Sequence, residues 1–134
     1  MFIANAFDEN KKVNGEWVDF CGARFKIASQ RSEKYVGAIN RLMKPYAKQI
    51  KNNTLTPEQN ESLLCAAMAE GLLLDWEGVG RIDEATGKAA ELPYSVENAK
   101  TVLKENYELR EFVAEYSEQL DNFKREAIED TVKK

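Results

Sequence analysis

The sequence predicts an α+β domain, mainly α, in which an N-terminal β-hairpin or small antiparallel sheet is followed by about four helices. Three observations predict it. Residues 24–27 alternate polar and apolar side chains with the period of two that is typical of a half-buried strand. Four later stretches repeat apolar residues every three or four positions, as amphipathic helices do. Residues 75–94 interrupt these stretches with glycine and proline.

The β-rich part should cover residues 1–30 of a single domain. Asn14-Gly15 is typical of a two-residue hairpin, because both residues tolerate the positive φ angles of a type I′ turn. A β-favouring run from Trp17 to Phe20 follows, and Cys21-Gly22 breaks it. The strand at 24–27 should then complete a small sheet that needs helices to cover it.

The helical part should cover residues 32–129, and its first helix should begin at Ser32, a good N-cap. Pro45 predicts a kink or a break after Met43, because proline lacks the amide hydrogen that a helix interior needs. Asn52-Asn53 should end this helix. Its apolar stripe consists of Val36, Ile39, Met43, Tyr46 and Ile50.

The second helix has the clearest start signal. Thr56-Pro57-Glu58-Gln59 combines an N-cap, a proline at the first helical position and the glutamine of a capping box. The helix is apolar on most sides through Leu72, so we expect it to be the central core helix. The following loop, residues 75–94, should hold an irregular hairpin with 79–82 opposite 89–92.

Two further helices should complete the domain. A short one begins at Ser95 with Val102 and Leu103 facing inward, and another begins near Asn106. The last helix repeats apolar residues with a strict period of seven. These residues are Leu109, Val113, Tyr116, Leu120, Phe123 and Ala127.

Composition excludes several classes of function. The net charge is −4 and no run of lysine or arginine exists, so we expect no nucleic-acid partner. No apolar run approaches the roughly 20 residues that span a bilayer, and the start lacks a signal-peptide pattern. We therefore expect a cytoplasmic protein without a membrane partner. Cys21 and Cys65 lie in apolar neighbourhoods and should be buried, reduced residues.

The chain also lacks the residues of common catalytic sites. It has no histidine, and therefore neither the commonest general base nor a Ser-His-Asp arrangement. Asp75, Glu77, Asp83 and Glu84 share one loop, but their order does not fit an EF-hand. We expect no enzymatic activity, no metal and no cofactor.

One segment, residues 72–95, carries a longer pattern. In it Trp76 follows an aliphatic run, and it should clamp the loop against the second helix with its indole N–H bonded to the backbone. The whole pattern resembles the tail assembly chaperones of long-tailed bacteriophages with flexible, non-contractile tails, and the resemblance extends loosely from Arg24 to Phe123. The residues that carry it are Asp75, Trp76, Glu77, Gly78, Val79, Leu92, Pro93, Tyr94 and Ser95.

The resemblance implies a role in the cytoplasm of the infected bacterial host. Such chaperones bind the tape measure protein, keep this long helical chain soluble, help to recruit tail tube subunits, and do not join the mature virion. The implied partners are the tape measure protein, the tail tube protein and further copies of the chain itself. Two other hypotheses stay open: a structural tail component, such as a terminator or connector, and a prophage adaptor with no tail role.

A chaperone of this kind needs apolar surface that can face a helical client. Leu73 and Leu74 are one candidate, because a run of three leucines points to different sides of a helix. The last helix is the other candidate, although packing of its stripe on the second helix of the same chain is the interpretation we favour. The residues concerned are Phe112, Tyr116, Leu120 and Phe123.

Overall fold

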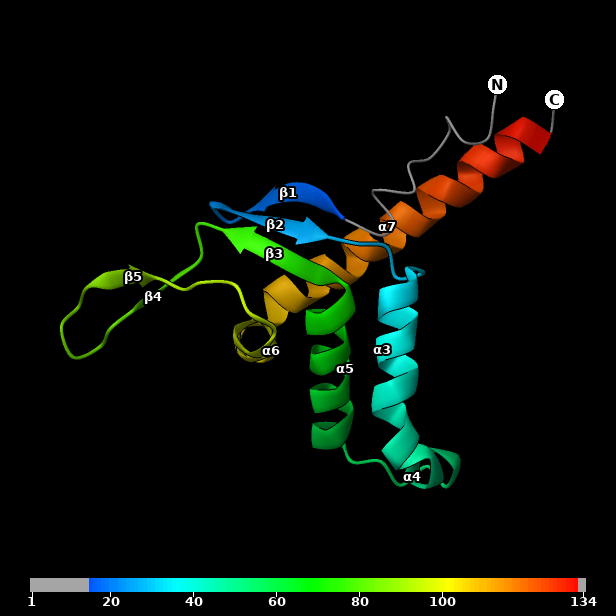
Figure 1. The fold of residues 1–134 in the computed structure, drawn as a ribbon, viewed down its shortest axis with the longest axis horizontal. Coiled ribbons are helices and arrows are strands. Elements are labelled where there is room, and N and C mark those ends of the chain that lie inside the picture. Colours follow the sequence, from blue (N-terminus) through cyan, green and yellow to red (C-terminus); the bar gives the residue numbers. More distant parts are fainter. Residues whose placement is uncertain (1–14, 133–134) are drawn as a thin grey trace.

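The computed structural model describes the backbone of residues 15–132 and the side chains of residues 15–120, and it confirms the predicted mainly helical α+β fold. A three-stranded sheet, a separate two-stranded hairpin and a set of helices make up this part of the chain (Figure 1). In chain order the elements are β1 (Glu16–Phe20), β2 (Ala23–Ile27), α3 (Glu33–Met43), the 3₁₀ turn η1 (Lys44–Tyr46), α4 (Ala47–Lys51), α5 (Pro57–Gly71), β3 (Leu73–Glu77), β4 (Gly80–Ile82), β5 (Ala89–Glu91), α6 (Val96–Glu105) and α7 (Tyr107–Val132).

The main sheet is antiparallel with β2 in its centre, in the order β1-β2-β3. Phe25 of β2 lies opposite Val18 of β1 and Trp76 of β3, so all three point to the same face of the sheet. Helices cover this apolar face. The other face carries Arg24, which lies over the ring of Trp17 and pairs with charged neighbours.

The β1–β2 hairpin turns at Cys21 and Gly22, where the sequence predicted a break between two strands. Both residues have positive φ angles, 49° and 82°, as a type I′ turn requires. Cys21 is therefore exposed at the tip, which corrects its predicted burial, whereas Cys65 is buried as expected. The hairpin predicted at Asn14-Gly15 needs a strand before residue 15, and that segment lies outside the described residues.

The helix boundaries follow the predicted caps. The side chain of Ser32 accepts a bond from the Tyr35 amide, and Thr56 and Gln59 form the complete capping box. Pro45 ends α3 at Met43 and leaves a 3₁₀ turn before α4, as its missing amide hydrogen predicts. Figure 1 shows α3 and α5 side by side.

The segment after α5 departs from the prediction. The helix stops at Gly71, and Leu73 and Leu74 belong to strand β3, not to a last helical turn. Leu73 pairs with Ile27, and the amide of Ala28 donates to the carbonyl of Leu72 over 2.9 Å. This strand pairing with β2 supplies the backbone hydrogen bonds that a longer helix would have made internally.

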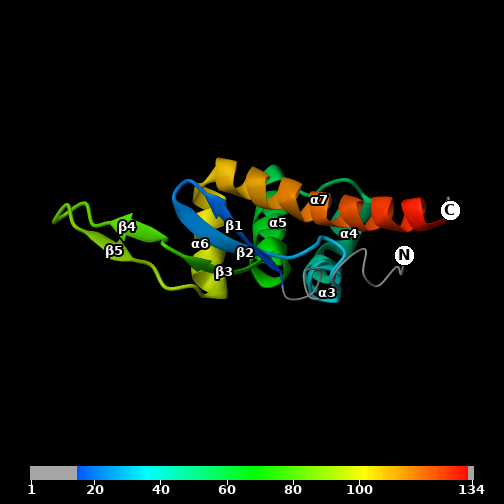
Figure 2. The same ribbon diagram turned by 90° about the horizontal axis from the view of Figure 1, so that it is seen from above.

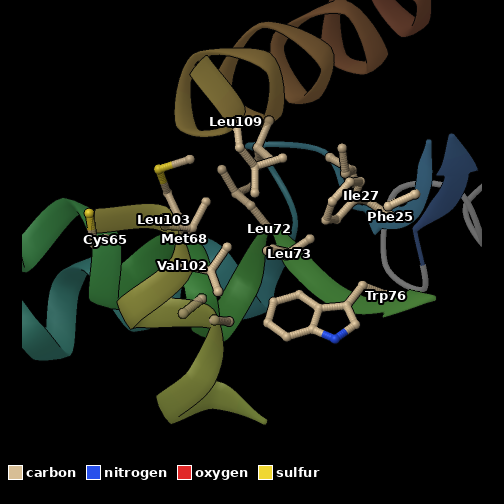
Figure 3. Packing of buried hydrophobic residues seen from close by; sticks show 14 residues of the cluster. Phe25, Ile27, Cys65, Met68, Leu72, Leu73, Trp76, Val102, Leu103 and Leu109 are labelled. Atoms are coloured by element: carbon tan, nitrogen blue, oxygen red, sulfur yellow. The ribbon is translucent and has the colours of Figure 1, made fainter. Parts of the chain in front are cut away.

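The buried core lies where α5, α6, α7 and the apolar face of the sheet meet (Figure 3). Helix α5 is its centre, as predicted, since most of its second half is buried. The N-terminal part of the α7 stripe packs within the same chain, because Leu109 and Val113 join this cluster. The largest fully buried apolar side chains are Ile27, Met68, Leu72, Leu73, Leu103 and Val113.

Two elements extend away from this core in opposite directions (Figures 1 and 2). The β4–β5 hairpin confirms the predicted pairing, with Arg81 opposite Ala90. Helix α7 has 26 residues and is thus roughly 39 Å long, whereas a five-residue strand of the sheet spans only about 17 Å. The sheet therefore covers less than half of α7, and its C-terminal half projects beyond the body.

Candidate functional site

Trp76 ties the loop that leads into α6 to strand β3. Its side chain is only 6% exposed, and its indole Nε1 donates to the carbonyl oxygen of Leu92 over 2.8 Å. Its ring meets the ring of Tyr94 edge to face, with the centroids 5.2 Å apart. The predicted indole hydrogen bond is thus confirmed, although its partner lies in the returning loop and Trp76 itself sits on a strand.

Tyr94 completes this clamp by satisfying carbonyl groups at the end of α5. Its hydroxyl lies 2.7 Å from the carbonyl oxygen of Leu73 and 3.1 Å from that of Ala69. Ala69 belongs to the last turn of α5, where carbonyl groups lack partners within the helix. Ser95 then caps α6 by accepting from the amide of Asn98, and the Asn98 side chain donates to the carbonyl of Pro93. These hydrogen bonds fix the conformation of residues 93–98, which belong to or follow the sequence pattern at 72–95.

The acidic residues of the sequence pattern at 72–95 also have structural partners. Asp75 accepts a bond from the backbone amide of Trp76 over 2.8 Å, and Glu77 pairs with Arg24 across the sheet. Gly78 has a φ of 78°, which favours glycine at the bend into β4. Within the described residues, no group of three His, Cys, Asp or Glu side chains is placed to hold a metal ion.

The surroundings of Tyr94 make the free energy of unfolding fall at alkaline pH. Burial, and secondly the charge of Asp75, raise the pKa of Tyr94 from 10.0 to about 12. Because the unfolded chain loses this proton near pH 10 and the folded chain only near pH 12, stability is fully present below pH 10 and falls as pH rises between these values. Tyr116, with a pKa of about 12, adds to the same fall.

We therefore expect Tyr94→Phe to make the decline in stability between pH 10 and 12 less steep, leaving the contributions of Tyr116, Tyr35 and Tyr107, whose pKa values are also raised. Urea unfolding at intervals from pH 8 to about 11.5 measures this slope. Tyr46→Phe is the matched control, a tyrosine in the 3₁₀ turn η1, outside the clamp. Equal slopes in the wild type and the Tyr94→Phe chain would contradict the prediction.

The residues predicted to face a partner are less exposed to solvent than expected. Leu73 is fully buried, so it cannot form a partner surface; Leu74 is half-buried, at the point where the β2–β3 register shifts. Phe112 stacks on Phe20 with the ring centroids 4.4 Å apart, and Tyr116 lies beside it. Leu120 is half-buried, and the side chain of Phe123 lies outside the described residues.

An open hollow of about 650 Å³ lies between the β1–β2 turn, strand β4 and the junction of α6 and α7. Its apolar lining comes from Phe20, Phe25, Val79, Leu92, Val102 and Leu109. Two apolar side chains at its rim are well exposed, Ile82 at 71% and Tyr107 at 59%. Neither residue was predicted from the sequence, because each is an isolated apolar residue among polar neighbours and gives no periodic signal.

A smaller apolar groove runs between α3 and α5. Its lining includes Ile39 and Met43 from α3 and Leu63 and Leu64 from α5. Leu64 is 42% exposed, and Val36 on the adjoining surface of α3 is 43% exposed. The first helix stripe predicted from sequence is therefore only partly covered by α5.

The hollow and the groove are suited to binding apolar side chains of another polypeptide. In the part of the chain that the structure describes, no helix is long and apolar enough to cross a membrane.

Comparison with known proteins relates this chain to a prophage family. No significant match was found among curated proteins or among solved structures. The family model described as YdaY prophage protein matches residues 29–134, which is well over half of the chain and includes the groove and most of the residues that line the hollow. The chain therefore belongs to the YdaY prophage protein family.

Proposed function

We propose that this prophage protein is a tail assembly chaperone, which binds the tape measure protein in the host cytoplasm, keeps it soluble and helps to recruit tail tube subunits. Membership of a prophage family supports a role in phage biology. The pattern from Asp75 to Val79 and from Leu92 to Ser95 supports the finer role by its resemblance to such chaperones. The proposal includes no catalytic step and no cofactor.

The hollow beside β4 is the observation that carries the proposal. The clamp of Trp76 and Tyr94 fixes the segments that contribute Val79 and Leu92 to its lining. A helical client with an exposed apolar stripe would bury Ile82 and Tyr107, which the folded chain leaves in water. Aromatic and aliphatic residues at the edge of a preformed hollow are typical anchors of protein interfaces.

Co-expression with the tape measure protein of the same prophage tests this function. We expect the wild-type chain to raise the soluble fraction of the tape measure protein and to co-purify with it. The double substitution Ile82→Asp and Tyr107→Ala should abolish both effects while leaving the fold intact, because both side chains are largely exposed. Val96→Asp is the matched control, an exposed apolar residue on α6 outside the hollow.

Two results would contradict the proposal. One is an unchanged soluble fraction of the tape measure protein together with no co-purifying complex. The other is the presence of the chain in purified phage particles, which would favour a structural tail component such as a terminator or connector.

A further inference from the structure

The groove between α3 and α5 has different side chains along its two edges. On one side the ion pair of Arg41 and Glu70 bridges the two helices. On the other side Val36, Met43 and Leu64 leave between 37% and 43% of their surface exposed. Gly71 lets the helices approach closely at the upper end of the groove, where it faces the backbone of Tyr35. The result is a preformed apolar trough with room for side chains from outside.

The segment that carries α3 and α4, on one side of this trough, is basic. Helix α5, on the other side, carries three glutamates and no basic residue, but two of the three are paired, Glu61 with Arg110 and Glu70 with Arg41. Residues 33–51 carry five lysine or arginine residues and one glutamate, a net charge of +4. Arg41 is used in the ion pair with Glu70, but among the described residues no carboxylate lies within ion-pair distance of the other four. These four are Lys34, Lys44, Lys48 and Lys51. A partner that fits the trough should therefore be an apolar segment with acidic flanks.

Helix α7 of this same chain has that chemistry. Residues 107–132 carry eight acidic and three basic residues, a net charge of −5. Its projecting half alone, residues 120–132, carries four acidic and two basic residues, a net charge of −2. The apolar period of seven continues in the sequence through Phe123 and Ala127, in the half of α7 that projects beyond the sheet (Figure 1).

The lengths also agree. The segment from Leu120 to Val132 has 13 residues and spans roughly 20 Å as a helix, and the 11 residues of α3 span roughly 16 Å. A chain cannot fill its own trough with this segment. The backbone of α7 passes the loop before α3, where the Gln30 amide lies 3.5 Å from the Ser117 carbonyl oxygen, and then leads away from the α3–α5 pair (Figure 1).

We propose that the projecting half of α7 of one copy docks in the α3–α5 trough of a second copy. The contact is head to tail, since it joins two different surfaces, and a pair of copies keeps one free trough and one free α7 end. It can therefore be repeated from copy to copy. The proposal does not depend on the identity of any client, because it concerns the chain alone.

Light scattering of the purified full-length chain at increasing concentration tests the contact. The wild type should form dimers and larger assemblies. Leu64→Glu places a charge in the trough, and Phe123→Glu places one on the projecting helix. Each variant should associate about 10- to 100-fold more weakly, which is the loss expected for one buried apolar side chain. Added salt should weaken the wild-type assemblies by screening the lysine–glutamate attraction.

Mixing the two variants separates this geometry from any other. Leu64→Glu keeps an intact α7 and Phe123→Glu keeps an intact trough, so the mixture should form a one-to-one dimer that cannot grow. Circular dichroism checks that both chains are folded, and Met43→Glu replaces Leu64→Glu if that chain unfolds. Ile82→Asp, a substitution in the hollow, is the control and should assemble like the wild type.

Three outcomes would overturn the proposal. The first is a wild-type chain that stays monomeric at every concentration. The second is a trough variant that assembles like the wild type while the α7 variant does not, which would indicate pairing of α7 with α7. The third is a mixture of the two variants that forms no dimer. None of these outcomes bears on the solubility assay with the tape measure protein, so the two proposals can fail separately.

Discussion

Replacing Trp76 by alanine is expected to lower the free energy of unfolding by about 3–5 kcal/mol, the usual cost of removing a large aromatic side chain from a core. Three contacts would be lost together. The indole fills the space beneath β3 (Figure 3), its N–H bonds to the Leu92 carbonyl, and its ring packs on Tyr94. Urea denaturation followed by circular dichroism measures the change.

Two further variants separate packing from hydrogen bonding. Trp76→Phe keeps most of the ring volume but leaves the Leu92 carbonyl without its donor, so we expect a smaller loss of about 1–3 kcal/mol. Trp17 lies on the outer face of the sheet beneath Arg24, and Trp17→Ala should cost less than about 1 kcal/mol, since it leaves the core filled. Equal losses for Trp76→Ala and Trp17→Ala would contradict the clamp described here.

Gly71→Ala is expected to destabilise the protein by about 1–3 kcal/mol, although alanine normally favours a helix. A Cβ atom at this position would overlap the Cα of Tyr35 and lie 2.7 Å from its backbone nitrogen. Backbone atoms cannot rotate away as a flexible side chain can, so α3 and α5 would have to separate. Thermal unfolding gives the size of the effect.

Gly37→Ala provides the opposite case in the neighbouring helix. Gly37 lies in the middle of α3, and a Cβ atom there would meet nothing within 4 Å. The same substitution should therefore stabilise the protein by about 0.5–1 kcal/mol, through the lower backbone entropy of the unfolded chain. A shared sign for the two substitutions would show that helix propensity, and not the close approach at Gly71, controls stability.

The helix ends were predictable because their causes are local. Ser32, Thr56 and Ser95 each bond an amide three residues further along the chain, so a short window of sequence contains the whole interaction. Pro45 acts in the same way by lacking an amide hydrogen. The β4–β5 hairpin was predictable for a similar reason, since its strands lie close together in the sequence.

Strand β3 was not predictable from the same kind of information. The run from Leu72 to Leu74 is compatible with a helix end or with a buried strand, and short apolar runs do not distinguish the two. Pairing with β2 decides between them, and that strand lies more than 40 residues earlier. This long-range contact also explains why Leu73 belongs to the core and not to a partner surface.

The candidate binding surfaces were predictable only in part. The apolar stripe of α3 was visible as a period of three and four, but its incomplete burial depends on how α5 crosses it. The hollow combines residues from three separate parts of the chain, and its most exposed members, Ile82 and Tyr107, have no apolar neighbours in the sequence. Only the folded arrangement brings them to one rim.

The turn between β1 and β2 gives the molecule a built-in attachment point for a spectroscopic probe. The sequence has two cysteines, and Cys65 is buried while Cys21 is exposed and contributes to the rim of the hollow. A thiol-reactive dye would therefore label one position without any engineering. Its fluorescence would report the arrival of a client helix directly, at the place where client binding is proposed.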